Sequence, residues 1–326
     1  MKNPAIRIPA LDGLRGIAAL SVMLYHYTSA FGERFNTMLT TRTWEFEYGR
    51  YGVDLFFIIS GFVIYKTIER VYSPSEFLFK RLVRLFPTFW FCMLLTYFSM
   101  LYFGPELYKS NLKELFINMS MVPSLFHTRA IDSVYWSLLV QWCFYLFILL
   151  LLFLGLHHKM KYVTVIYLIL YAFICFQFHF IMELYYGSLF LMGIAFYRIW
   201  RSDRDLLWHL QIFSYLFLTL FSPNRIDFIV MAILMVIFYL FIYGETGLLK
   251  FRPLVFLGEI SFALYLIHHY VGHSIQLILV EHGLNNYFLL LLSPIFLMVL
   301  LAYLITIGFE KPIISYLHRS GKQIFR

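Results

Sequence analysis

The chain has 326 residues, of which 61% are hydrophobic, 21% aromatic and only 13% charged. A soluble globular domain carries roughly 25% charged residues, so this composition excludes one soluble core and indicates that the bilayer acts as solvent. The net charge of +8 is explained by the preference of Lys and Arg for cytoplasmic loops, and without a soluble basic face it does not predict nucleic-acid binding.

Ten apolar runs are close to the length of about 20 residues that a membrane-spanning helix needs. We therefore predict an all-α fold, a polytopic transmembrane helical bundle with about ten spans. It is expected to form a single transmembrane domain over residues 1–326, without an appended soluble domain, and to end its last span at Glu310-Lys311-Pro312. The predicted spans are residues 11–31, 53–69, 82–103, 134–155, 161–177, 180–199, 206–222, 226–243, 254–280 and 286–309.

The distribution of basic residues predicts the orientation of this bundle. With the N-terminus in the cytoplasm, ten spans place 19 of the 26 Lys and Arg residues on the inner side and 7 on the outer side. Cytoplasmic loops carry such an excess of Lys and Arg. We therefore expect both termini on the cytoplasmic side.

Ionisable residues inside a span are expensive to bury, so each one is a candidate for a functional site. Arg15 and His26 are 11 residues apart in the first span, a spacing that returns to within about 20° of the same helical face. Asp54 begins the second span at the level expected for His26, where a carboxylate can orient an imidazole. Taken alone, a snorkelling arginine and a hydrogen-bonded buried histidine would also explain the first two residues.

Three basic residues open the third span on the predicted cytoplasmic side. Arg81 and Arg84 are three positions apart and share a helical face, and Lys80 precedes them. Such a cluster can hold phosphate groups, although basic residues at this position also serve as membrane anchors.

Two later spans also contain polar side chains. Ser137 and Gln141 are one helical turn apart in the fourth span. In the ninth span, His269 and His273 have the i, i+4 spacing of a metal pair, but no H-E-x-x-H motif accompanies them. We therefore predict no metal site, and we consider His268, near the middle of the span, the better site candidate.

These residues lie in five segments that follow one another in a characteristic order. The segments are LDGLRGIAALSVMLYHY with Arg15 and His26, YGVDLFFIISGF with Asp54, KRLVRLFP with Arg81 and Arg84, YWSLLVQWCFYL with Trp136 and Ser137, and LGEISFALYLIHHYV with Tyr265 and His268. Together they resemble the acyltransferase-3 family of membrane acyltransferases over nearly the whole chain.

The resemblance implies a bacterial cytoplasmic (inner) membrane enzyme that transfers an acyl group from acyl-coenzyme A. Acetyl-coenzyme A is the expected co-substrate, with no tightly bound cofactor. The expected acceptor is a hydroxyl of a cell-surface polysaccharide, such as lipopolysaccharide or exopolysaccharide, or of its lipid-linked precursor.

The resemblance also suggests roles for the residues. His26 is the expected general base, with Asp54 to orient it and Arg15 to steady the thioester. Lys80, Arg81 and Arg84 are expected to bind coenzyme A. The other site candidates are Trp136, Ser137, Gln141, Tyr265 and His268.

One position departs from the family pattern, because Gln141 stands where relatives normally carry Glu. An amide cannot act as a base, so a catalytically silent relative remains an alternative. A transporter or flippase of a lipid-linked glycan is another alternative, although the internal repeats typical of such proteins are not evident.

Some relatives carry a fused extracellular domain that passes the acyl group on. Without one, we expect direct transfer. The sequence leaves the acyl group, the acceptor and the oligomeric state open.

Overall fold

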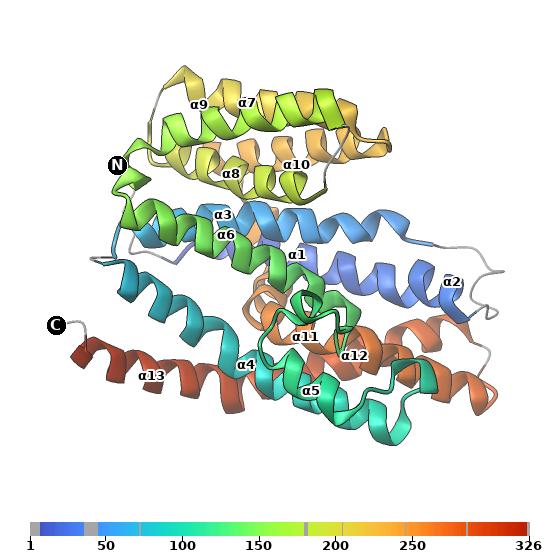
Figure 1. Cartoon of the computed structure of the whole chain (residues 1–326). Helices are drawn as coiled ribbons and strands as arrows, with labels where there is room; N and C mark the ends of the chain where they lie inside the picture. Colours follow the sequence, from blue (N-terminus) through green and yellow to red (C-terminus); the bar gives the residue numbers. More distant parts are fainter. Residues whose placement is uncertain are drawn as a thin grey trace. The chain divides into compact units, whose positions relative to one another are not determined.

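The computed structural model describes residues 7–35, 45–71, 73–178, 182–203, 205–244, 246–284 and 286–324 (Figure 1). Every regular element among them is helical, which confirms the all-α prediction. The main helices are α1 (Pro9–Tyr25), α2 (Phe31–Phe35), α3 (Gly52–Ile68), α4 (Pro74–Phe103), α5 (Leu112–Asn118), α6 (Trp136–Phe153), α7 (Met160–Phe178), α8 (Met182–Trp200), α9 (Leu206–Leu218), α10 (Ile226–Tyr243), α11 (Arg252–Glu281), α12 (Tyr287–Ile305) and α13 (Lys311–Ile324). Short π or 3₁₀ turns used below are η1 (His26–Ala30), η4 (Glu106–Tyr108), η6 (Ser133–Tyr135), η9 (Leu248–Lys250) and η10 (Thr306–Glu310).

Seven segments of the described chain are long and apolar enough to cross a membrane. They are Glu47–Ile68, Pro74–Phe103, Ser133–Phe153, Leu156–Gln177, Ile226–Tyr243, Arg252–Glu281 and Tyr287–Gly321. Each coincides with a predicted span, and together they make this a multi-pass membrane protein. The remaining predicted spans fall on α1, α8 and α9, so the total of ten and the orientation of the termini stay predictions.

The helix of the last predicted span continues beyond Glu310-Lys311-Pro312. Glu310, Lys311 and Pro312 lie inside a continuous helical segment, because the π turn η10 leads directly into α13. Proline is tolerated at the first turn of a helix, where its missing N–H needs no partner. The helix therefore does not stop at this position, and the end of the membrane span stays a prediction.

The chain divides into two compact units whose segments alternate along the sequence. Unit 1 consists of Met1–Leu14, Val53–Leu78 and Val140–Val255, and unit 2 of Arg15–Gly52, Phe79–Leu139 and Phe256–Arg326. Because neither unit is one continuous stretch, this division does not correspond to two consecutive domains. The single domain stays a prediction.

In unit 1, helices α7 to α10 lie side by side with short connections (Figure 1). Helix α8 forms much of the core, since Leu189, Phe190, Ile194 and Ala195 are fully buried. Large apolar side chains of the neighbouring helices remain exposed, as expected of surfaces that contact lipid rather than water.

Two glycines let α3 and α8 approach each other closely within unit 1. A side chain added at Gly61 would overlap the backbone of Phe190, and one added at Gly193 would overlap the carbonyl of Ile58. Small residues commonly bring membrane helices into backbone contact in this way. The close packing of α3 against α8 therefore requires glycine at both positions.

We predict that Gly193→Ala lowers the stability of the purified protein. Overpacking of this kind typically costs about 1–3 kcal/mol, so the midpoint of thermal unfolding in detergent should fall. Gly247→Ala, at the start of η9, is the matched control because an added Cβ there meets open space. Equal midpoints for the two variants would contradict the close α3–α8 contact.

Helix α11 positions the polar residues of unit 2. Its Gly272 leaves room for the ring of Tyr27, whose hydroxyl donates a 2.7 Å hydrogen bond to the carbonyl of His268. Nearer the start of the helix, the Tyr135 hydroxyl donates a 3.0 Å bond to the carbonyl of Leu266. These contacts place one face of α11 against the first helix and against the beginning of α6.

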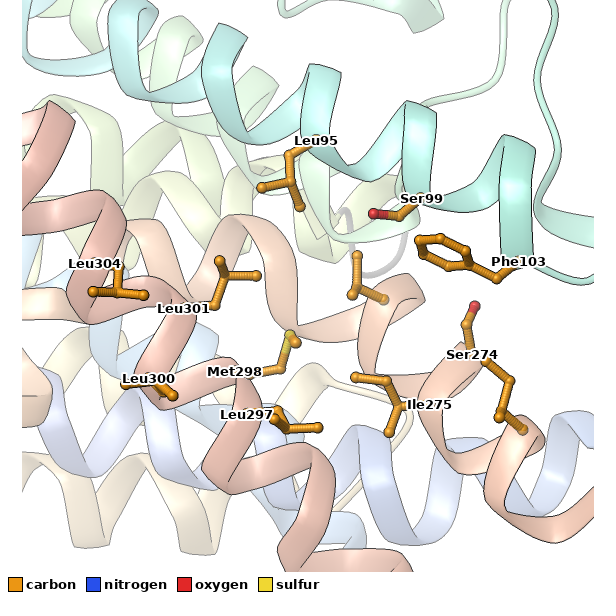
Figure 2. Close-up of a pocket in the computed structure, with 12 residues that line it drawn as sticks. Leu95, Ser99, Phe103, Ser274, Ile275, Leu297, Met298, Leu300, Leu301 and Leu304 are labelled. Carbon is orange, nitrogen blue, oxygen red and sulfur yellow. The ribbon is translucent and has the colours of Figure 1, made fainter. Parts of the chain in front are cut away.

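The opposite face of α11 lines an apolar cavity of about 390 Å³, together with α4 and α12 (Figure 2). Apart from Ser99 and Ser274 its lining is hydrocarbon or thioether. The α11 residues that line it are Val271, Ser274, Ile275 and Ile278. At 100° per residue, the centre of this side lies roughly opposite His269 and His273, whereas His268 is within about 20° of Ile275. None of the residues that line the cavity is a histidine.

Candidate active site

The first helical segment, α1 followed by the π turn η1, contains both Arg15 and His26. It is a regular α-helix from Pro9 to Tyr25, so the spacing between Arg15 and His26 follows ordinary helical geometry. The π turn η1 then begins at His26 itself. Such single π turns inside helices occur frequently at functional sites. Both side chains are half-buried.

Hydrogen bonding determines which nitrogen of His26 carries a proton. Its Nδ1 lies 2.9 Å from the carbonyl oxygen of Val22 and 3.3 Å from Nε2 of His268. A carbonyl oxygen can only accept, so Nδ1 is the protonated nitrogen. The lone pair is therefore on Nε2, which leaves this nitrogen able to act as a base.

Two histidines of α11 hold His26 in place. Nδ1 of His268 donates to the Tyr265 carbonyl at 2.8 Å, so its Nε2 is the acceptor that faces His26. His273 donates from Nε2 to the His26 carbonyl at 2.8 Å and accepts from the Tyr108 hydroxyl at 2.8 Å. One histidine therefore contacts the ring of His26, and the other contacts its backbone.

A third histidine of α11 is paired with a carboxylate. Nδ1 of His269 donates to Oδ1 of Asp132 at 2.7 Å, and the Tyr270 amide donates to Oδ2 at 2.9 Å. Asp132 is fully buried and immediately precedes the span that begins at Ser133. Burial raises the pKa of this carboxyl to about 6. The ring centroids of His269 and His26 are 4.2 Å apart.

The Trp-Ser-Leu segment also reaches α11. The Ser137 hydroxyl lies 2.8 Å from that of Tyr265, which in turn donates to the Val134 carbonyl at 3.0 Å. The side chain of Trp136 is exposed instead. Ser137 and Tyr265 were both site candidates from sequence, and the structure brings them into direct contact.

Asp54 and Gln141 belong to unit 1, whereas the histidine cluster belongs to unit 2. Asp54 is buried and accepts a 2.6 Å hydrogen bond from the Tyr185 hydroxyl. Within the described ranges, the buried Nε2 of Gln141 has no hydrogen-bond partner. The pairing of Asp54 with His26 stays a prediction, and the effect of the amide at position 141 stays open.

The basic residues at the start of α4 differ in their surroundings. Arg81 is buried, whereas Lys80 and Arg84 are half-buried. Arg84 forms an ion pair with the buried Glu310 at the end of the π turn η10, and its guanidinium lies 5.2 Å from the centroid of the Phe262 ring. Part of the charge of Arg84 is therefore already balanced by the protein.

Comparison with known families identifies the chain. A family model described as an acyltransferase domain matches residues 8–307. The chain belongs to the acyltransferase-3 family. The sequence resemblance is thereby confirmed, and the protein is a membrane O-acyltransferase.

Individual relatives carry consistent names. The chain is 26% identical over 287 residues to a protein of the Acidianus two-tailed virus named as an acetyltransferase, an alignment that covers 80% of this chain and 82% of that protein. It is 25% identical over 158 residues to the peptidoglycan O-acetyltransferase OatA of Listeria monocytogenes, and 33% identical over 108 residues to the O-acetyltransferase OatA of Staphylococcus aureus. These alignments cover 43% and 31% of this chain, but only 23% and 15% of the two longer proteins. No solved structure matches.

Two contributors to the cluster, Asp132 and Tyr108, were not predicted from the sequence. His269 and His273 were considered there only as a metal pair. In the described part of the chain, no three His, Cys, Asp or Glu side chains are arranged to hold a metal ion. The sequence contained one indication of Asp132, because an acidic residue directly before a predicted span is expensive to bury.

We predict that Arg84→Ala destabilises the protein and that a second change, Glu310→Gln, restores stability. Removal of the cation leaves the buried Glu310 without the partner that balances its charge, which is more costly than the loss of both charges. The midpoint of thermal unfolding measures both variants. If Arg84→Ala alone leaves the midpoint unchanged, the ion pair does not support the fold.

Proposed function

We propose that this acyltransferase moves an acyl group, preferably acetyl, from acyl-coenzyme A to a hydroxyl of a cell-surface polysaccharide or of its lipid-linked precursor. The bacterial cytoplasmic membrane is the proposed location. The main support is the half-buried His26, whose lone pair is on Nε2 because Nδ1 donates to the Val22 carbonyl. The O-acetyltransferase names of the relatives favour an acetyl group. The peptidoglycan in the name of the Listeria relative favours a glycan acceptor.

In the proposed reaction, Nε2 of His26 accepts the proton of the acceptor hydroxyl while its oxygen attacks the thioester carbonyl. The C–S bond then breaks, an ester remains on the acceptor, and coenzyme A leaves as a thiol after taking up that proton. Arg15 is assigned to the pantetheine arm of coenzyme A rather than to the reacting oxygen, because 11 residues of helix, roughly 16 Å, separate it from His26.

The phosphates of coenzyme A are assigned to Arg81, Arg84 and Lys80 at the start of α4. Arginine binds phosphate through paired N–H groups, and a cluster of cations attracts an anionic ligand from the cytoplasm. Arg84 is also paired with Glu310, so part of its charge is already balanced within the protein.

We predict that His26→Ala reduces transfer about 10²–10⁴-fold, which is the usual contribution of a general base. The measurement is transfer of radiolabelled acetyl from acetyl-coenzyme A to polysaccharide of the source organism, by purified protein in lipid nanodiscs. His282→Ala is the matched control, because that exposed histidine likewise bonds its own helix, from Nδ1 to the Ile278 carbonyl at 2.7 Å. Near-normal transfer by folded His26→Ala protein would rule out the proposed base.

We predict that Arg81→Gln weakens the binding of acetyl-coenzyme A about tenfold or more, since a hydrogen bond to a charged group contributes about 1.5–3 kcal/mol. Titration calorimetry at two salt concentrations measures this, and added salt should weaken wild-type binding more than variant binding. Arg319→Gln, at an exposed position of α13, is the control. An unchanged dissociation constant for Arg81→Gln would reject the assignment.

A further inference from the structure

We propose that Asp132 and His269 form a positioning pair through which a buried carboxylate stabilises the protonated form of His26 during acyl transfer. None of the five family segments predicted this role for either residue. The inference rests on the proposed function, because it requires His26 to be the base.

The contacts of Asp132 suit a carboxylate that remains ionised. Its Oδ1 accepts from His269 Nδ1 at 2.7 Å and from the Val134 amide at 3.2 Å, while Oδ2 accepts from the Tyr270 amide at 2.9 Å. Three N–H donors thus surround a side chain that is 0% exposed. A carboxylate held by several N–H groups is fixed in position as well as in charge.

His269 connects this charge to His26. Since its Nδ1 donates to the carboxylate, its lone pair lies on Nε2, the same state that the hydrogen bonds give to His26. The two rings are 4.2 Å apart and tilted by 50°. When His26 takes up a proton, the new positive charge therefore arises beside an imidazole already polarised toward a carboxylate. A carboxylate orients and stabilises an imidazolium by the same principle in serine hydrolases.

Among the residues that the structure describes, the remaining neighbours of His26 do not supply a negative charge. Val22 offers a carbonyl oxygen, and His268 offers a lone pair. The other titratable or charged groups that face the pair are His273, Tyr265 and Tyr270 of α11, Tyr25, Tyr27, Arg34 and Tyr108. Arg34 lies with its guanidinium 5.4 Å from the centroid of the Tyr108 ring and adds positive charge on this side. Asp132 offsets that charge.

The test compares Asp132→Asn, His269→Gln and the double variant with wild type, as purified protein in nanodiscs with acetyl-coenzyme A and polysaccharide acceptor. Each single change should lower kcat about tenfold or more and leave the KM for acetyl-coenzyme A unchanged. The acidic limb of the kcat profile should move to lower pH, because a protonated His26 without the carboxylate is less stable. The double variant should be no slower than the slower single variant, since both changes break one connection.

Asp203→Asn is the matched control, because Asp203 also accepts hydrogen bonds from ring and guanidinium N–H groups but lies in unit 1. An unchanged pH profile in Asp132→Asn, or additive losses in the double variant, would overturn the proposal. If Asp132→Asn does not fold, His269→Gln gives the decisive profile. Full activity of His26→Ala would instead refute the proposed function. Loss of activity in His26→Ala with normal profiles in both single variants would refute only this inference.

Discussion

The hydrogen bond from His26 Nδ1 to the Val22 carbonyl is the interaction on which the rest of the site depends. It lies within one turn of the first helix and leaves the other ring nitrogen with its lone pair. The Nε2 lone pair of His268, 3.3 Å from the same nitrogen, favours the same tautomer. The π turn that starts at the same residue leaves the His26 carbonyl 2.8 Å from Nε2 of His273, which donates to it.

The cost of polar groups in a membrane explains why so many partners surround one imidazole. A buried ring nitrogen without a partner is expensive, so each histidine of α11 has an identifiable acceptor or donor. The close packing that allows this arrangement depends on Gly272, which admits the Tyr27 ring beside His268. The same principle accounts for Glu310, a buried carboxylate that Arg84 balances.

Much of the fold followed from residue composition and periodicity. The all-α class and seven of the predicted spans needed only runs of apolar residues, which report directly on the bilayer. The other three predicted spans lie on α1, α8 and α9, where charges or shorter apolar runs weaken that signal. Spacing also placed Arg15 and His26 on one helix, because periodicity within a helix is a local property.

Contacts between distant helices were harder to predict. Spacing showed that His269 and His273 share a face of α11 but not that Asp132, 137 positions away from His269, meets that face. The pair was therefore considered for metal binding alone. In the same way, FEKP suggested the end of a helix, although Glu310 stands in a π turn and pairs with Arg84 over 226 positions. The contact between Ser137 and Tyr265 was likewise not predictable from spacing, although the family resemblance named both residues, and their role at the site stays a prediction.

The most direct measurement is an experimental structure of the protein in a lipid nanodisc with a ketone analogue of acetyl-coenzyme A, in which a methylene group replaces the thioester sulfur. Its carbonyl carbon should lie roughly 4–6 Å from Nε2 of His26, which leaves room for one acceptor oxygen between them. The nucleotide phosphates should lie at the start of α4. A carbonyl bound elsewhere, or a His26 ring that faces lipid, would contradict the assignment of His26 as the base.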